Sequence, residues 1–185
     1  MSQVFVNILA RRYAEAALEA AREKGLADTV LRDLQRAATL FPQVDGLLDT
    51  LKNPAMPMDR REDLIGKVAR AAGFNTLTAN LLKLLLRNGR LGLLDAIMAG
   101  YTEALDQERG IVRARVITAK PLPLQHGLKL SEALKRHLGA KRVILEKVVD
   151  PEILGGVRVV VGDRVFDMSV QGYLKNLKQR LLGGS

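Results

Sequence analysis

The sequence of 185 residues contains no cysteine, no tryptophan and only two histidines. The lack of cysteine excludes disulfides, iron–sulfur and zinc–thiolate sites, and a thiol nucleophile. His126 and His137 lie eleven positions apart, and no cluster of carboxylates accompanies them, so their spacing does not fit a metal site. We therefore expect neither a metal nor a cofactor.

Motifs for nucleotide binding and covalent catalysis are also missing. Gly66-Lys67 superficially matches a phosphate-binding loop, but Val68 replaces the required Ser or Thr and Arg61 stands where the first glycine belongs. Gly155-Gly156 is not followed by the glycine spacing of a dinucleotide site, and no serine lies in a G-x-S-x-G motif. The sequence predicts a protein that is not an enzyme.

Aromatic residues are few, seven in all, whereas leucine and alanine contribute 32 and 21 residues. Both side chains lose little freedom in a helix, so the composition predicts a mainly α-helical protein. No apolar run approaches the roughly 20 residues that a membrane-spanning helix needs, and the first residues lack a signal-peptide pattern. We expect a soluble, cytoplasmic chain without direct membrane insertion.

Charge and valine content divide the sequence into two regions. Residues 1–105 carry 14 basic and 12 acidic side chains, and residues 106–185 carry 15 and 8, so most of the net charge of +9 lies in the second region. Valine rises from five residues in the first region to 11 in the second, and valine favours strands. We predict two domains, a helical one over residues 1–108 and a mixed one over residues 109–185.

Apolar residues recur every three to four positions in six segments of the N-terminal domain. Asp59 and Glu62 have the spacing of a capping box at the start of the fourth segment. The pattern predicts a compact six-helix bundle. Turn signals separate its helices at Gly25, Pro42, Asn53-Pro54, Gly73 and Asn88-Gly89.

Two of these helices carry features of a binding surface. The first is rich in small alanines, so a partner helix can approach its backbone closely. The fifth, over residues 77–86, contains more leucine than a single core-facing stripe needs, and such surplus apolar surface commonly marks a groove for an amphipathic helix. For each leucine on its own, packing in the core is the simpler interpretation.

The C-terminal domain has the pattern of a small α/β (α+β) module with a three- to four-stranded sheet. Segments rich in β-branched residues predict strands at 111–118, 143–149, 157–161 and 164–166, the last two joined by a two-residue loop at Gly162-Asp163. One helix is expected after the first strand, and a closing helix over residues 170–181. The apolar face of the first of these helices is predicted to consist of Leu124, Leu128, Ser131, Leu134 and Leu138.

The charge of the C-terminal domain leaves its partner open. An RNA-binding helical adaptor is the main alternative function on this basis. The domain has only two aromatic rings for stacking on bases, Phe166 and Tyr173, which argues against nucleic acid as the partner. The basic side chains that are either solvated, or form a patch for nucleic acid or for an acidic protein helix, are Arg113, Arg115, Lys141, Arg142, Arg158 and Arg164.

Several segments, in order along the chain, carry a family resemblance. They are Ala10–Ala16 (ARRYAEA), Lys52–Pro54 (KNP), Leu84–Leu91 (LLLRNGRL), Ala119–Leu122 (AKPL), Val149–Val157 (VDPEILGGV), Gly162-Asp163 and Asp167–Val170 (DMSV). Together they resemble the δ-subunit family of F-type ATP synthases, whose mitochondrial relative is the oligomycin-sensitivity-conferring protein. The segment at 149–157 is the most specific, and the resemblance covers essentially the whole chain.

The resemblance implies a non-catalytic stator subunit that links the catalytic head of the proton-translocating enzyme to its peripheral stalk, so that rotation is coupled to ATP synthesis. It implies that the N-terminal domain binds the N-terminal helix of an α subunit and that the C-terminal domain binds the b subunits. It also implies a peripheral membrane protein, held through the complex on the cytoplasmic face of the bacterial plasma membrane.

The resemblance places the α-subunit-binding groove between the first and fifth helices. If Ala14 and Ala17 line this groove, Ala14→Asp or Ala17→Asp is expected to weaken head binding, because an unpaired charge would be buried there. Carried over by position, the groove residues are Tyr13, Ala14, Ala17, Leu18, Leu81, Leu84, Leu85 and Asn88.

Overall fold

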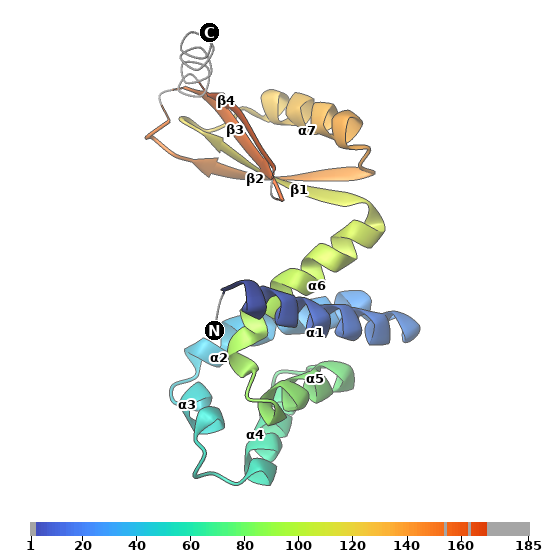
Figure 1. The fold of residues 1–185 in the computed structure, drawn as a ribbon, viewed down its shortest axis with the longest axis vertical. Coiled ribbons are helices and arrows are strands. Elements are labelled where there is room, and N and C mark those ends of the chain that lie inside the picture. Colours follow the sequence, from blue (N-terminus) through green and yellow to red (C-terminus); the bar gives the residue numbers. More distant parts are fainter. Residues whose placement is uncertain (1–2, 154, 163, 170–185) are drawn as a thin grey trace, which may run out of the picture. The chain divides into compact units, whose positions relative to one another are not determined.

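The structure is a computed structural model that describes residues 3–153, 155–162 and 164–169 (Figure 1). The chain divides into two compact units, a first unit over Met1–Leu105 and a second unit over Asp106–Ser185. In the part of the chain that is described, no helix is both long enough and apolar enough to cross a membrane.

Six α-helices precede the first strand, as predicted, and a short 3₁₀ helix, η1, comes before the sixth. The last of them, α6, ends at Arg109, so the boundary expected between residues 108 and 109 lies in its final turn. The helices are α1 (Gln3–Glu23), α2 (Ala27–Gln43), α3 (Leu47–Lys52), α4 (Met58–Ala71), α5 (Thr76–Arg87), η1 (Leu91–Leu93) and α6 (Leu94–Arg109).

Glycines end α1 and α5, and both adopt backbone angles that other residues rarely take. Gly25 has a φ of 65° and Gly89 a φ of 64°. After α1, the Gly25 N–H donates to the Arg22 carbonyl at 2.9 Å and the Leu26 N–H donates to the Ala21 carbonyl at 2.8 Å, which satisfies the last carbonyls of the helix. The turn signals predicted at these two glycines are confirmed.

The predicted capping box at Asp59 and Glu62 is wrong. Helix α4 begins one residue earlier, at Met58, after Pro57, and no side chain caps it. Glu62 instead accepts hydrogen bonds from Arg87 at the end of α5, with Arg87 Nη2 at 2.7 Å from Glu62 Oε2. The spacing that suggests a local cap thus serves a contact between two helices.

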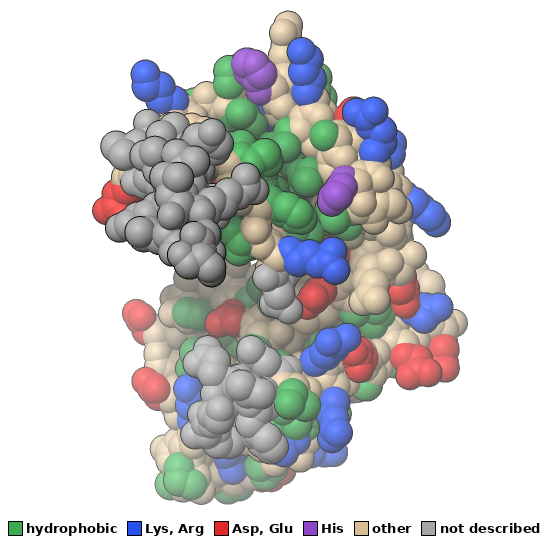
Figure 2. All heavy atoms as spheres, turned by 45° about the horizontal axis from the view of Figure 1, so that its top comes forward, with side chains coloured by type: hydrophobic (Ala, Val, Ile, Leu, Met, Phe, Trp, Pro, Cys, Tyr) green, Lys and Arg blue, Asp and Glu red, His purple; other side chains and the backbone are tan. Residues whose placement is uncertain are grey.

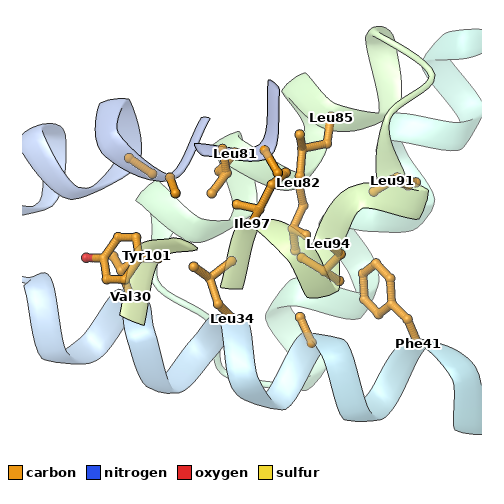
Figure 3. Packing of buried hydrophobic residues seen from close by; sticks show 14 of the residues in the cluster. Val30, Leu34, Phe41, Leu81, Leu82, Leu85, Leu91, Leu94, Ile97 and Tyr101 are labelled. Carbon is orange, nitrogen blue, oxygen red and sulfur yellow. The ribbon is translucent and has the colours of Figure 1, made fainter. Parts of the chain in front are cut away.

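The core of the first unit is formed mostly by aliphatic side chains, and all six α-helices and η1 contribute to it. Figure 3 shows Leu34 from α2, Leu82 and Leu85 from α5, and Ile97 from α6 pointing toward one another, and all four are fully buried. Tyr101 is also fully buried, and its hydroxyl donates to the Ala27 carbonyl at 3.0 Å. Most of the leucine excess in the sequence therefore packs in this core.

The second unit contains a four-stranded mixed sheet, which confirms the predicted fold class. Strands β1 and β2 pair in parallel, and β1–β3 and β3–β4 pair antiparallel, in the order β2-β1-β3-β4. Helix α7 (Leu124–Leu138) connects the parallel strands. The predicted closing helix and Asp163 of the hairpin loop lie outside the described residues. The strands are β1 (Ile111–Thr118), β2 (Arg142–Val149), β3 (Gly156–Val161) and β4 (Arg164–Ser169).

The apolar face predicted for α7 is partly wrong. Leu124 and Leu128 are 72% and 60% exposed, whereas Gly127 and Leu134 are buried. A small core forms where Leu134 packs with Ala114, Val116 and Val159 of the sheet. The helix is rotated relative to the prediction, and Gly127 lies next to the Lys147 side chain of β2 and to Leu122.

Candidate protein-binding surfaces

The described residues contain no group of three or more His, Cys, Asp or Glu side chains that could hold a metal ion. The features described below are the exposed apolar and charged surfaces of each unit. The eight predicted groove residues come first, because they lie on α1 and α5, and these two helices contact each other.

Most of the predicted groove residues belong to the core of the first unit. Only Leu84, at 46%, and Asn88 are exposed, and Tyr13 is half-buried. The other five have exposed fractions of 8% or less, and they are Ala14, Ala17, Leu18, Leu81 and Leu85. These five side chains pack in the core beneath the exposed residues, and they are not part of the exposed surface itself.

The burial of Ala14 changes what the proposed alanine substitutions test. Ala14 is fully buried, and a β-carbon added at Gly100 of α6 would lie 3.3 Å from the Ala14 β-carbon. A carboxylate in place of this methyl group would be buried between two helices without a partner, so Ala14→Asp destabilises the bundle itself. The same argument applies to Ala17, which is 5% exposed. Exposed positions are needed to test binding.

Helical periodicity extends the exposed surface to residues that the sequence reasoning missed. Leu84 of α5 and Asn88, the residue that caps the C-terminus of this helix, lie on one side, four residues apart. On α1, Ala16 is exposed and Ala20 is half-buried, and both share the side of Tyr13 at spacings of three and seven. We call these five residues the α1–α5 surface. The sequence does contain a sign of this surface: on α1, a second row of small residues lies beside the alanines that face the core.

Contacts at both ends fix α5. Asp33 of α2 is 4% exposed, and its Oδ2 accepts hydrogen bonds from the Asn75 backbone N–H at 2.7 Å and from Thr78 Oγ1 at 2.9 Å. The Asn75 side chain caps the helix by accepting from the Leu77 N–H at 2.9 Å. At the other end, the hydrogen bond from Arg87 lowers the pKa of the Glu62 carboxyl below its usual value. The helix that carries Leu84 and Asn88 is thus held in one position.

A further contact joins α1 to the end of α5. Arg90, three residues after α5, donates a hydrogen bond to the Tyr13 hydroxyl, and its guanidinium carbon lies 5.5 Å from the centroid of the Tyr13 ring. A cation over an aromatic face typically contributes about 0.5–2 kcal/mol. This contact keeps Tyr13, a member of the α1–α5 surface, beside the end of α5.

The sequence suggested a basic patch for nucleic acid in the second unit. Three of the arginines in that candidate patch are paired with carboxylates. Arg115 lies 3.8 Å from Glu146, and Arg158 lies 3.3 Å from Asp167. Arg113 pairs with Asp106. Because these carboxylates offset the arginine charges, the sheet offers less positive potential to a phosphate backbone than the sequence suggests.

The second unit also exposes large apolar side chains. Leu124 and Leu128 lie on α7, and Val165 and Met168 of β4 are 59% and 58% exposed. Met168 pairs with Val157 and shares its side of the sheet, whereas Val165 pairs with Val160 on the opposite side. Figure 2 shows hydrophobic side chains gathered over the upper part of the molecule, in the second unit. Exposed apolar surface of this extent is typical of protein-binding sites.

Comparison with known proteins gives one consistent result. A family model described as ATP synthase delta (OSCP) subunit matches residues 9–181. The chain is 36% identical to the ATP synthase subunit delta of Desulfatibacillum aliphaticivorans over 94% of this chain and 94% of that protein. It is 36% identical to that of Myxococcus xanthus over 95% of this chain and 98% of that protein.

A solved structure has the same fold. A chain in the cryo-EM structure of the Toxoplasma gondii mitochondrial ATP synthase hexamer matches with a TM-score of 0.71 and 25% sequence identity. The match covers 94% of this chain and 97% of that chain. Both units of the structure are therefore included in the similarity.

Proposed function

The chain belongs to the ATP synthase delta (OSCP) subunit family, whose members are non-catalytic stator subunits of ATP synthase, and from this we propose that it joins an α subunit of the catalytic head to the b subunits of the peripheral stalk. The observation that carries the proposal is the extent of the family match. It spans residues 9–181 and so includes both units. The protein takes part in ATP synthesis and proton transport without an active site of its own.

The first unit is the proposed binding site for the N-terminal helix of an α subunit. The α1–α5 surface offers the small side chains of Ala16 and Ala20 on one helix and Leu84 on the other, so an amphipathic helix can approach closely and bury an apolar stripe. The contacts that fix α5 support this proposal, because a preformed surface loses little conformational freedom on binding.

The second unit is the proposed binding site for the b subunits. Its exposed apolar side chains on α7 and β4 provide area to bury against a protein partner. The pairing of Arg115 and Arg158 with carboxylates favours this protein partner over the alternative of an RNA-binding adaptor.

The mechanical role follows from having two binding sites on one chain. Torque from the rotating shaft acts on the catalytic head, and the head must be held still for catalysis to be coupled to proton flow. A chain that binds head and stalk at once gains avidity, because each bound site keeps the other at high local concentration. We propose that this holds the protein at the cytoplasmic face of the bacterial plasma membrane through the complex.

Calorimetric titration of the full chain with the N-terminal peptide of the α subunit tests the head contact. Leu84→Asp places a charge on the α1–α5 surface and is expected to weaken binding about tenfold or more. Ile8→Asp is the matched control, because Ile8 is 52% exposed on the other side of α1 and its change should leave affinity within about twofold. Unchanged affinity for Leu84→Asp would contradict the assignment.

Affinity isolation from membranes tests the partners as a whole. We expect the tagged chain to recover the α, β and b subunits of ATP synthase. Recovery of RNA in their place, with an affinity that falls steeply as salt rises, would favour the RNA-binding adaptor.

A further inference from the structure

A small pocket of about 170 Å³ lies in the first unit, and we call it the Arg61 pocket. It is formed by the end of α3, the first turn of α4 and the segment that runs from the end of α5 into η1. Lys52 and Arg61 are the charged residues among the described residues that line it, and none of those residues is acidic. Positive charge beside an apolar floor attracts an anion more strongly than the same charge in open water. The rest of the lining consists of buried leucines and of glycines, namely Leu51, Leu86, Leu91, Gly89 and Gly92.

The protein satisfies the Arg61 guanidinium only in part. Its Nη1 donates to the Leu51 carbonyl at 3.5 Å, which is longer than the usual range of about 2.7–3.2 Å. Its Nε is buried and has no hydrogen-bond partner among the described residues. A buried charged donor without an acceptor is unfavourable, because it has lost its contacts with water and gained none in exchange. An acceptor oxygen bound in the pocket would supply the missing hydrogen bond.

Another arginine of the same unit shows which ligand fits this group. Arg87 donates from both Nε and Nη2 to the two oxygens of the Glu62 carboxylate, with Nη2 at 2.7 Å from Oε2. On a guanidinium, Nε and Nη2 lie along one edge, and their hydrogens match two oxygens of a carboxylate or a phosphate. The Nη1 of Arg61 is turned to Leu51, so its Nε–Nη2 edge is the side that remains for a ligand. A ligand with two such oxygens therefore fits Arg61.

The second cation and the volume favour phosphate over a carboxylate. Lys52 is the last residue of α3 and is exposed, so its ammonium acts as a point charge at the rim of the pocket. Phosphate carries more than one negative charge near neutral pH, and its four oxygens can accept from Arg61 and Lys52 at once. The volume equals that of roughly five or six water molecules in the liquid. It is below the roughly 300 Å³ at which pockets for larger ligands begin, so a free ion fits and a nucleotide does not.

We propose that the Arg61 pocket binds one inorganic phosphate ion, held by the Nε–Nη2 edge of Arg61 and by the Lys52 ammonium. The pocket shares no residue with the α1–α5 surface, so this inference does not depend on how the chain binds an α subunit. Residues 51–52, 61 and 86–92 are distant in sequence and meet at the pocket. Bound phosphate therefore joins three segments and stabilises the first unit by mass action.

Isothermal titration calorimetry of the full chain with sodium phosphate tests this proposal, at an ionic strength kept constant with sodium chloride. We expect saturable binding of one phosphate per chain at millimolar concentrations. Arg61→Gln should weaken this binding about tenfold or more, because it removes the charge together with the two-donor edge. Arg60→Gln is the matched control, because Arg60 is exposed on α4 and does not line the pocket, and affinity should stay within about twofold.

Two further variants keep the test decisive if Arg61→Gln alters the fold. Lys52→Gln changes an exposed side chain, so it should leave the circular dichroism spectrum unchanged and weaken phosphate binding about threefold or more. Arg61→Lys keeps the charge without the two-donor edge, and it should retain only part of the affinity. Lack of saturation, equal losses for Arg60→Gln and Arg61→Gln, or full affinity in Lys52→Gln or Arg61→Lys would overturn the proposal. Acetate that binds as tightly as phosphate would overturn it as well, because the site would then accept a carboxylate equally.

Discussion

A single carboxylate oxygen, Asp33 Oδ2, satisfies two donors at the N-terminus of α5. A carboxylate that is 4% exposed is stable only when hydrogen bonds replace its lost contacts with water, and here the donors are the Asn75 backbone N–H and the Thr78 hydroxyl. Since α5 provides Leu84 and Asn88 to the α1–α5 surface, these three residues help to set the geometry at which an α-subunit helix would bind.

Removing one donor tests the importance of this network. Thr78→Val keeps the shape of the side chain but leaves part of a buried carboxylate unsatisfied, so the free energy of unfolding should fall by about 1–3 kcal/mol. The matched control is Thr39→Val, because the exposed Thr39 hydroxyl donates to the Gln35 carbonyl within the same helix, and its loss should cost less than about 0.5 kcal/mol. Urea unfolding followed by circular dichroism measures both changes, and equal losses would contradict the role of Asp33.

Residues of this kind are difficult to predict from the sequence. Asp33 and Thr78 are 45 positions apart, and only the packing of α2 against α5 brings them together. The same is true of Arg90 and Tyr13, which are 77 positions apart. The glycine stop at Gly25, in contrast, depends on local backbone angles alone and was predicted correctly.

At the scale of elements, helix periodicity predicts that a helix exists more reliably than which side of it is buried. The bounds of α7 agree with the apolar pattern, but two stripes that share Leu134 and Leu138 fit the sequence equally well. The stripe with Leu124 and Leu128 contains more leucine, and the structure buries the stripe with Gly127. A hydrophobicity pattern does not count glycine as apolar surface, so it does not point to the stripe that contains Gly127.

The rotation of α7 predicts a large loss of stability for a leucine-to-alanine substitution at one position and a small one at another. Leu134→Ala removes a side chain that is 8% exposed and packed against the sheet, so the second unit should lose about 2–5 kcal/mol of unfolding free energy. Leu128→Ala removes one that is 60% exposed and should change stability by less than about 0.5 kcal/mol. Thermal unfolding followed by circular dichroism compares them. A larger loss at Leu128 would show that the originally predicted face is the buried one.

For the whole molecule, the proposed function makes the chain one link between two attachments. The head contact on the first unit and the stalk contact on the second unit act in series, because torque that reaches the stalk has passed through both. In a series linkage the weaker attachment determines when the linkage slips. Contacts that share a load in parallel would instead fail in proportion to the number that are removed.

This difference predicts how two surface variants combine in the assembled enzyme. Leu84→Asp on the α1–α5 surface and Leu128→Asp on α7 are each expected to lower ATP-driven proton pumping by inverted membrane vesicles, while ATP hydrolysis continues. For attachments in series, the double variant should pump about as poorly as the worse single variant, with no multiplicative loss. Ile8→Asp, exposed on α1 outside the α1–α5 surface, is the control that should pump normally. Full pumping by Leu128→Asp would exclude this part of α7 from the stalk contact, and a multiplicative loss in the double variant would contradict the series arrangement.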